Sequence, residues 1–221
     1  MAQLRLKIPA IQQSFYKENQ IEAINNVLGN IGANYYAIIN NIANITNVPY
    51  YLLKAFIFIE SGGNPNVISS AGAVGLMQIA PISATDIVWQ EANQKRLNSF
   101  ERNMLIKYIG APAMACIEGM QYRSQKRACN GNTGFLITKQ HLLNPELNIL
   151  IGAIYIGILI DEESSGGQVR LDRVVVRYNR GYFNKKGLSG SITDILANMN
   201  NESRSYIVKL LGKNGLLDIL I

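Results

Sequence analysis

One acidic residue stands out as a candidate for chemistry, because it follows an apolar segment and directly precedes glycines. Residues 50–59 read Tyr-Tyr-Leu-Leu-Lys-Ala-Phe-Ile-Phe-Ile, and they are followed by Glu60 and then by Ser-Gly-Gly at 61–63. Proline favours a helix start and glycine favours a helix end, so we expect a helix from about Pro49 to this turn. The carboxyl group of Glu60 would then lie at the mouth of a turn.

Helical spacing also predicts the surroundings of this acid. Phe56 lies one turn back from Glu60, and Leu52 or Leu53 lies two turns back, so apolar side chains share its face. Burial among apolar groups favours the neutral form of a carboxyl group and raises its pKa. An acid that stays protonated near neutral pH can donate a proton to a glycosidic oxygen, which is general-acid catalysis of sugar cleavage. The alternative is that Glu60 is simply a polar residue at a helix C-terminus.

Three stretches of sequence favour the catalytic interpretation. Residues 60–65 read Glu-Ser-Gly-Gly-Asn-Pro, residues 69–81 read Ser-Ser-Ala-Gly-Ala-Val-Gly-Leu-Met-Gln-Ile-Ala-Pro, and residues 178–181 read Tyr-Asn-Arg-Gly. Together these motifs resemble the catalytic core of the lytic transglycosylases of the soluble (SLT) type. The resemblance implies an all-α or mainly α lysozyme-like transglycosylase fold of the goose-lysozyme kind, and it implies peptidoglycan as the substrate.

The resemblance also implies a mechanism with one carboxyl group. Glu60 would protonate the leaving oxygen of the MurNAc-β-1,4-GlcNAc bond, and the MurNAc 2-acetamido group would assist by stabilising the cationic centre. Glu60 would then take the proton of the MurNAc C6 hydroxyl, which attacks C1 and closes a 1,6-anhydro ring without water. The nearest acidic residue downstream of Glu60 is Asp86, outside the motif region, which agrees with a single catalytic acid.

Other site residues are carried over from the family's motifs by position. The resemblance implies substrate contacts from Ser61, Ser69, Met77, Gln78, Tyr155, Tyr178 and Asn179. We expect residues 76–79 to begin a helix that points Gln78 into a groove. Taken alone, Met77 is more typical of a core residue, and Tyr178 fits a core-edge tyrosine equally well.

Two other functions remain open. A goose-type lysozyme would use the same fold as a hydrolase, but it needs a second carboxylate to hold water, from among Asp86, Glu91, Glu101 and Glu118. A non-catalytic peptidoglycan-binding or structural component would keep the fold without turnover. The intact motif residues Glu60, Gln78 and Tyr178 argue against that second alternative.

Composition restricts the partners. The net charge of +6 indicates an anionic partner. The basic residues are scattered and accompany no nucleic-acid motif, so an acidic wall polymer fits better than nucleic acid. His141 is the only histidine and no ligand cluster is visible, so we predict no metal and no cofactor. Cys116 and Cys129 are equally compatible with a disulfide and with free thiols.

The sequence contains no recognisable signal peptide or membrane span. The longest apolar run, residues 147–160, has 14 residues, which is short of the roughly 20 that a transmembrane helix needs. The N-terminus lacks an unbroken apolar core. We therefore expect action on the periplasmic cell wall after delivery by a phage particle, a holin or a secretion machine. A virion or secretion partner would bind through the N-terminal helix or the C-terminal apolar tail.

The remaining chain is predicted to be helical. Apolar periodicity indicates an added helix at 9–28 that stops at Gly29, followed by helices at 33–45, 145–160, 171–180 and 202–211. We divide the chain into an N-terminal extension at 1–30 and a catalytic domain at 31–221. An insertion at about 86–144 is either a lid beside the groove or a surface elaboration. The tail at 215–221 would dock on the core or on a larger assembly.

Overall fold

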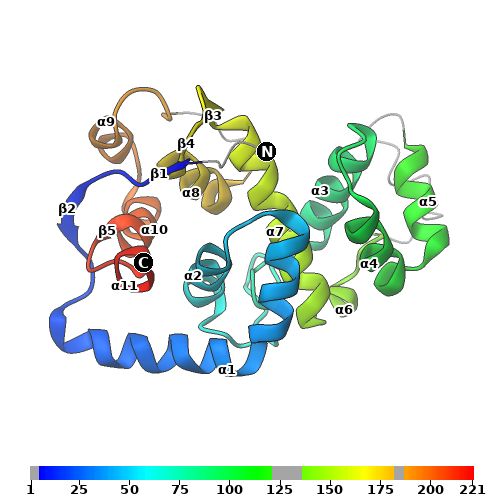
Figure 1. Cartoon of the computed structure of the whole chain (residues 1–221), viewed down its shortest axis with the longest axis horizontal. Coiled ribbons are helices and arrows are strands. Elements are labelled where there is room, and N and C mark those ends of the chain that lie inside the picture. The colour runs from blue at the N-terminus through cyan, green and yellow to red at the C-terminus, as the bar shows by residue number, and fades with distance from the viewer. Residues whose placement is uncertain (1–4, 121–135, 182–186) are drawn as a thin grey trace. The chain divides into compact units, whose positions relative to one another are not determined.

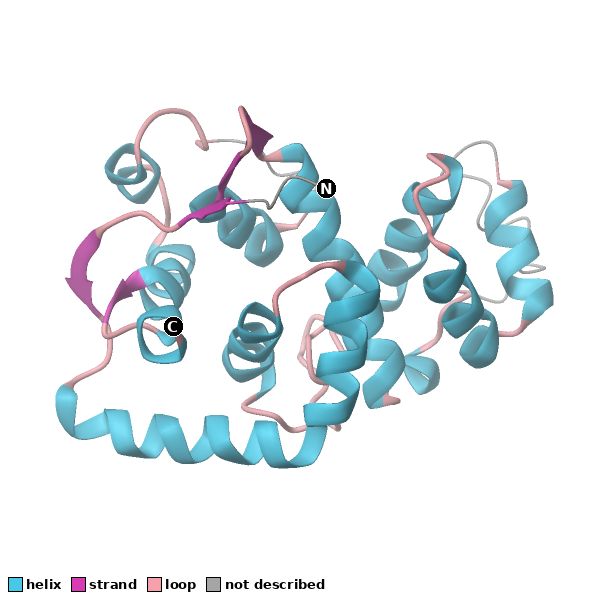
Figure 2. Cartoon of the chain, in the orientation of Figure 1, coloured by secondary structure: helices cyan, strands magenta, loops and turns pink. Residues whose placement is uncertain are grey.

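The computed structural model describes residues 5–120, 136–181 and 187–221, and it confirms a mainly α-helical protein (Figures 1 and 2). The chain forms two compact units. We call Ile31–Tyr155 the Glu60 unit, and we call Met1–Asn30 with Ile156–Ile221 the terminal unit. The helices α1 (Ile21–Thr46) and α7 (Pro145–Glu162) each run through a boundary between these units. Among the described residues, no helix has both the length and the apolar character to cross a membrane.

The described residues of the Glu60 unit form the C-terminal part of α1, the N-terminal part of α7 and five helices between them. These are α2 (Tyr50–Ser61), α3 (Pro81–Asn93), α4 (Ser99–Ile109), α5 (Ala111–Gly119) and α6 (Lys139–Leu142). In α2 one face buries Leu52, Leu53 and Phe56 completely, as the helical spacing predicts. Figure 1 shows α3, α4 and α5 gathered in one cluster, and α5 packs against both other helices.

Local capping explains where several of these helices begin. Asn98 accepts a hydrogen bond from the Glu101 N–H at the start of α4, and the Glu101 carboxylate accepts one from the Asn98 N–H in return. Asn144 precedes Pro145 and caps α7 by accepting a hydrogen bond from the Leu147 N–H. The helix expected at 145–160 is therefore confirmed, with its end at Glu162.

The terminal unit combines short strands with helices. A three-stranded sheet has the order β1 (Arg5–Lys7), β4 (Gln168–Arg170), β3 (Ser164–Ser165), with β1 parallel and β3 antiparallel to β4. A second sheet pairs β2 (Ile11–Ser14) with β5 (Gly212–Lys213) in parallel. The helical elements are η1 (Glu18–Gln20), α8 (Leu171–Arg180), α9 (Ile192–Ala197), α10 (Asn201–Leu211) and α11 (Leu216–Leu220).

The helix predicted from Pro9 to Leu28 is wrong in its first half. Residues 11–14 form β2, and the helix begins only at Ile21, because Ile11 is buried in a strand that pairs with β5. The predicted stop at Gly29 is also wrong, since α1 continues to Thr46. An interior glycine weakens a helix by only about 1 kcal/mol, and the buried Ile24, Leu28 and Ile31 on either side of Gly29 offset that cost.

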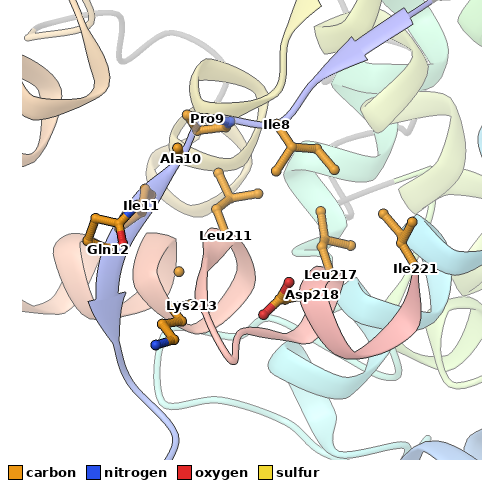
Figure 3. Close-up of a pocket in the computed structure, with 11 residues that line it drawn as sticks. Ile8, Pro9, Ala10, Ile11, Gln12, Leu211, Lys213, Leu217, Asp218 and Ile221 are labelled. Atoms are coloured by element: carbon orange, nitrogen blue, oxygen red, sulfur yellow. The ribbon is translucent and has the colours of Figure 1, made fainter.

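The C-terminal tail docks within its own unit. Leu216 and Leu217 of α11 are buried, and α11 packs on α10. Beside them a pocket of about 440 Å³ is lined by residues 8–12, 211–213, Leu217, Asp218 and Ile221 (Figure 3). None of these lining residues is among the predicted site residues.

Candidate active site

Glu60 is half-buried on the last turn of α2, and the turn that follows it is held in place from α1. Gly62 ends the helix in the left-handed conformation at φ 61°, and its N–H donates to the Phe58 carbonyl. The Tyr35 hydroxyl donates to the Gly63 carbonyl at 3.3 Å. A Cβ atom on Gly63 would lie 2.7 Å from Ile31 Cγ1, so only glycine allows this approach of the turn to α1.

Ser61 joins the end of α2 to the loop at 67–80. Its Oγ lies 2.8 Å from the Leu76 carbonyl oxygen and 3.1 Å from the Ile57 carbonyl oxygen, and it accepts a hydrogen bond from the Gly63 N–H. A hydroxyl has one proton, so the shorter contact identifies Leu76 as its main acceptor. The residue next to Glu60 is thereby attached directly to the second motif.

The loop at 67–80 is a set of tight turns with backbone pairing. Val74 bridges both Ile68 and Ile79, and the Gly75 N–H donates to the Val67 carbonyl at 2.8 Å. The helix expected to begin at 76–79 is wrong, because α3 begins only at Pro81. Gln78 has φ 47°, a left-handed conformation that is incompatible with a right-handed helix.

The Gln78 side chain closes this loop on itself. Its Nε2 donates to the carbonyls of Val67 at 3.1 Å and Gly75 at 2.9 Å. Both partners are acceptors, so they fix the orientation of the amide and turn its oxygen away from these two carbonyls. The amide oxygen is thus the part of the Gln78 side chain that these two bonds leave available.

Asn148 on α7 contacts the same loop from the protein interior. It is fully buried, and its Oδ1 accepts a hydrogen bond from the Met77 N–H at 2.7 Å. Its Nδ2 donates to the carbonyls of Val74 at 2.8 Å and Leu142 at 2.9 Å. Met77 itself is 0% exposed and packs against Gly152, so it supports the loop from beneath instead of presenting its side chain to solvent.

The predicted site residues are distributed over both units. Glu60, Ser61, Ser69 and Gln78 are half-buried in the Glu60 unit, where Ser69 Oγ accepts from the Ala73 N–H and closes a turn. Tyr155, on α7, is 6% exposed. Tyr178 and Asn179 lie on α8 in the terminal unit, where Tyr178 is buried and Asn179 Oδ1 accepts from Ser203 Oγ. The substrate contacts of these residues remain predictions.

Three of the four carboxylates considered for a hydrolase have structural partners of their own. Glu91 pairs with Arg96, and Glu118 pairs with Arg102 at 2.6 Å, a hydrogen bond that lowers the pKa of the Glu118 carboxyl group. Glu101 forms the capping box of α4, and its burial raises its pKa. By contrast, Glu60 is the only acidic residue between Glu22 and Asp86. The loop and turn around it therefore contribute no second carboxylate.

The resemblance places Asn148 at the Asn-Ile position of a family helix that backs the active site, but sequence reasoning gave no role to the side chains of Asn148 and Tyr35. A polar residue inside the apolar run at 147–160 was a usable signal for Asn148, since a fully buried amide needs several partners. Nothing in the sequence indicates that the Tyr35 hydroxyl reaches Gly63. The choice between a disulfide and free thiols for Cys116 and Cys129 falls outside the described residues, because Cys129 lies within 121–135.

Comparison with known proteins agrees with the fold and the motifs. Residues 37–104 match the model of the family described as "Transglycosylase SLT domain". The chain is 32% identical over 133 residues to "Endo-type membrane-bound lytic murein transglycosylase A" of Klebsiella pneumoniae, a match that covers 59% of this chain and 46% of that protein. The protein of the same name from Salmonella paratyphi B is 31% identical over 135 residues, covering 59% and 47%.

A shorter match has a higher sequence identity. It is 48% identical over 59 residues to the Citrobacter koseri protein of the same name, covering 24% of this chain and 29% of that protein. The chain spans about half the length of the curated relatives that it matches over 133 to 135 residues. The mainly helical fold, the motifs around Glu60 and these matches agree in one respect: residues 37–104, which include Glu60, are similar to the transglycosylase SLT domain.

Proposed function

We propose that this protein is a peptidoglycan lytic transglycosylase with Glu60 as its single acid and base. One observation carries the proposal: the half-buried carboxyl group of Glu60 lies on the last turn of α2, and the adjacent Ser61 binds the loop that matches the family's second motif. The relatives are named lytic murein transglycosylases, and murein is peptidoglycan. The bacterial cell wall is accordingly the proposed place of action.

In the proposed reaction Glu60 first gives a proton to the substrate and then takes one from it. Glu60 donates its proton to the oxygen of the MurNAc-β-1,4-GlcNAc bond, and the bond from C1 of MurNAc to that oxygen breaks. The resulting Glu60 carboxylate accepts the proton of the MurNAc C6 hydroxyl. The C6 oxygen bonds to C1 at the same time, and this bond closes the 1,6-anhydro ring. No water is consumed and Glu60 regains its starting state.

The partners of three of the four candidate carboxylates support this assignment over a two-carboxylate hydrolase. A hydrolase needs a second carboxylate that holds water or attacks the sugar. Glu91, Glu101 and Glu118 are engaged with Arg96, Asn98 and Arg102 respectively, so each already has a structural role. Tyr178 and Asn179 enter the proposal as substrate contacts on the strength of their motif alone.

Mass spectrometry of the products tests the proposal. Purified peptidoglycan is incubated with the protein, and the soluble fragments are analysed. Fragments that end in 1,6-anhydroMurNAc, lighter by one water than reducing-end muropeptides, support the transglycosylase. Reducing-end products would mean a lysozyme-type hydrolase, whereas an absence of products would favour a binding or structural component.

A further inference from the structure

We propose that Asn148 is a positioning residue that holds the loop at 67–80 in its active shape. The inference rests on the function proposed above and adds a residue on α7 to the machinery around Glu60. The Asn148 side chain is fully buried. The Asn148 carboxamide has two N–H donors and an acceptor oxygen, and all three functions are engaged by backbone groups.

The three bonds of Asn148 reach two separate segments. The Val74 carbonyl and the Met77 N–H belong to the loop, and the Leu142 carbonyl ends α6. The Val74 and Met77 bonds span the turn through Gly75 and Leu76, which fixes the distance between its two ends. The next residue along, Gln78, is then held in its left-handed conformation.

The packing shows that this contact needs a matching glycine. Gly75 has φ 76°, and a Cβ atom there would lie 2.6 Å from Asn148 Nδ2 and 2.7 Å from the Leu142 carbonyl oxygen. Both distances are too short for a real side chain, so the backbone at Gly75 lies against the amide. The glycine of the second motif thereby accommodates Asn148.

A short chain of bonds links Asn148 to the catalytic acid. Asn148 holds both sides of Leu76, and the Leu76 carbonyl accepts the hydrogen bond of Ser61, the residue next to Glu60. Misplacement of reacting groups by as little as 1 Å can lower a rate by about 100-fold. Loss of the amide should therefore reduce catalysis even though Asn148 touches no substrate.

Asn148→Asp gives a sharp test because it exchanges the N–H donors for a second oxygen. At pH 7.5 a carboxylate would face the carbonyls of Val74 and Leu142. Burial and these carbonyls raise the pKa of the introduced acid, so mild acid protonates it and restores one donor. We expect product release about 10- to 100-fold below wild type at pH 7.5 and within about threefold of wild type at pH 5.

Asn144→Asp is the matched control, since it makes the same chemical change four residues earlier. Asn144 accepts from the Leu147 N–H at the N-terminus of α7, and a carboxylate serves equally well there. We expect its activity to equal wild type at both pH values. Equal activity of Asn148→Asp and wild type at both pH values would overturn the proposal.

Amide hydrogen exchange tests the support of the loop by Asn148 in a measurement that does not depend on enzymatic activity. In the wild-type protein the Met77 N–H should be strongly protected, because its acceptor is the Asn148 side chain in the interior. If the wild-type Met77 amide exchanges as fast as the exposed Ser70 amide, the positioning role is excluded even when no variant folds. If the wild type releases no products but Met77 is protected, the proposed function fails and the loop support by Asn148 stands.

Discussion

Ser61 Oγ lies 2.8 Å from the carbonyl oxygen of Leu76, and this hydrogen bond joins the helix of the candidate acid to the glycine-rich loop. The two residues are 15 positions apart in sequence, so the bond connects the first motif with the second. Ser61 is predicted as a substrate contact, and its bonds in the structure hold the end of α2 to the loop.

Replacing Ser61 by alanine should weaken both stability and activity. The Leu76 carbonyl loses its donor in a residue that is 0% exposed, which costs about 1–3 kcal/mol of unfolding free energy. We expect the rate of product release to fall by about tenfold or more, because the loop is no longer held to α2. Urea denaturation and product assays measure both effects. Ser83→Ala, at an exposed position of α3, serves as control and should change neither.

Replacing Glu60 by glutamine should abolish cleavage while the fold persists. The amide has nearly the shape of the acid but cannot donate and recover a proton, so the rate should fall by at least about 100-fold. Release of soluble fragments from purified sacculi reports the rate, and co-sedimentation with sacculi reports binding. Glu22→Gln changes an exposed acid on α1 and should leave the rate as it is. Undiminished cleavage by Glu60→Gln would refute the assignment.

Gly152→Ala should destabilise the protein through Met77. A Cβ atom at this position would lie 2.8 Å from Met77 Cε and 3.0 Å from Met77 Cβ. A change of rotamer cannot move the Met77 Cβ, so the backbone must shift, and we expect a loss of about 1–3 kcal/mol in unfolding free energy. Gly29→Ala is the matched helical control. Nothing lies within 4 Å of its Cβ, and it should stabilise α1 by about 0.5–1 kcal/mol.

Two substitutions of Gln78 should separate the effect of backbone strain on stability from the effect of the lost hydrogen bonds. Both Gln78→Ala and Gln78→Gly lose the bonds to Val67 and Gly75, but only glycine adopts φ 47° without cost. We expect Gln78→Gly to be more stable than Gln78→Ala by about 1 kcal/mol, the reverse of the usual order in a helix. Denaturation curves of the two variants measure this difference. An alanine variant as stable as the glycine variant would show that the position is not strained.

Tyr16 should make stability fall at alkaline pH. Burial raises the pKa of its phenol from 10.0 to about 12. Between these two values the unfolded chain releases the proton while the folded chain retains it, so the unfolding free energy decreases as pH rises. Tyr16→Phe should flatten this decline between about pH 10 and 12. At pH 7, the difference in unfolding free energy between the variant and wild type reports the effect on packing alone. If the unfolding free energies of the two proteins fall with the same slope between about pH 10 and 12, the burial of the Tyr16 phenol is contradicted.

The sequence by itself determined the acid, its helix and the helices α7, α8 and α10. The apolar face at Leu52, Leu53 and Phe56 required a helix that ends at Gly62, and Asn144-Pro145 required the start of α7. These features depend on neighbours within a few residues, which the spacing of side chains records directly. The class of the domain followed from the same local motifs.

Only the tertiary structure decided how the loop at 67–80 is held and which N-terminal residues are strands. The left-handed conformation of Gln78 depends on bonds to Val67 and Gly75 and on support from Asn148, which is 71 residues from Met77. The strand at Ile11 depends on pairing with Gly212 near the other end of the chain. Such contacts between distant residues leave no periodicity in the sequence, because each is specified by the packing of the whole fold.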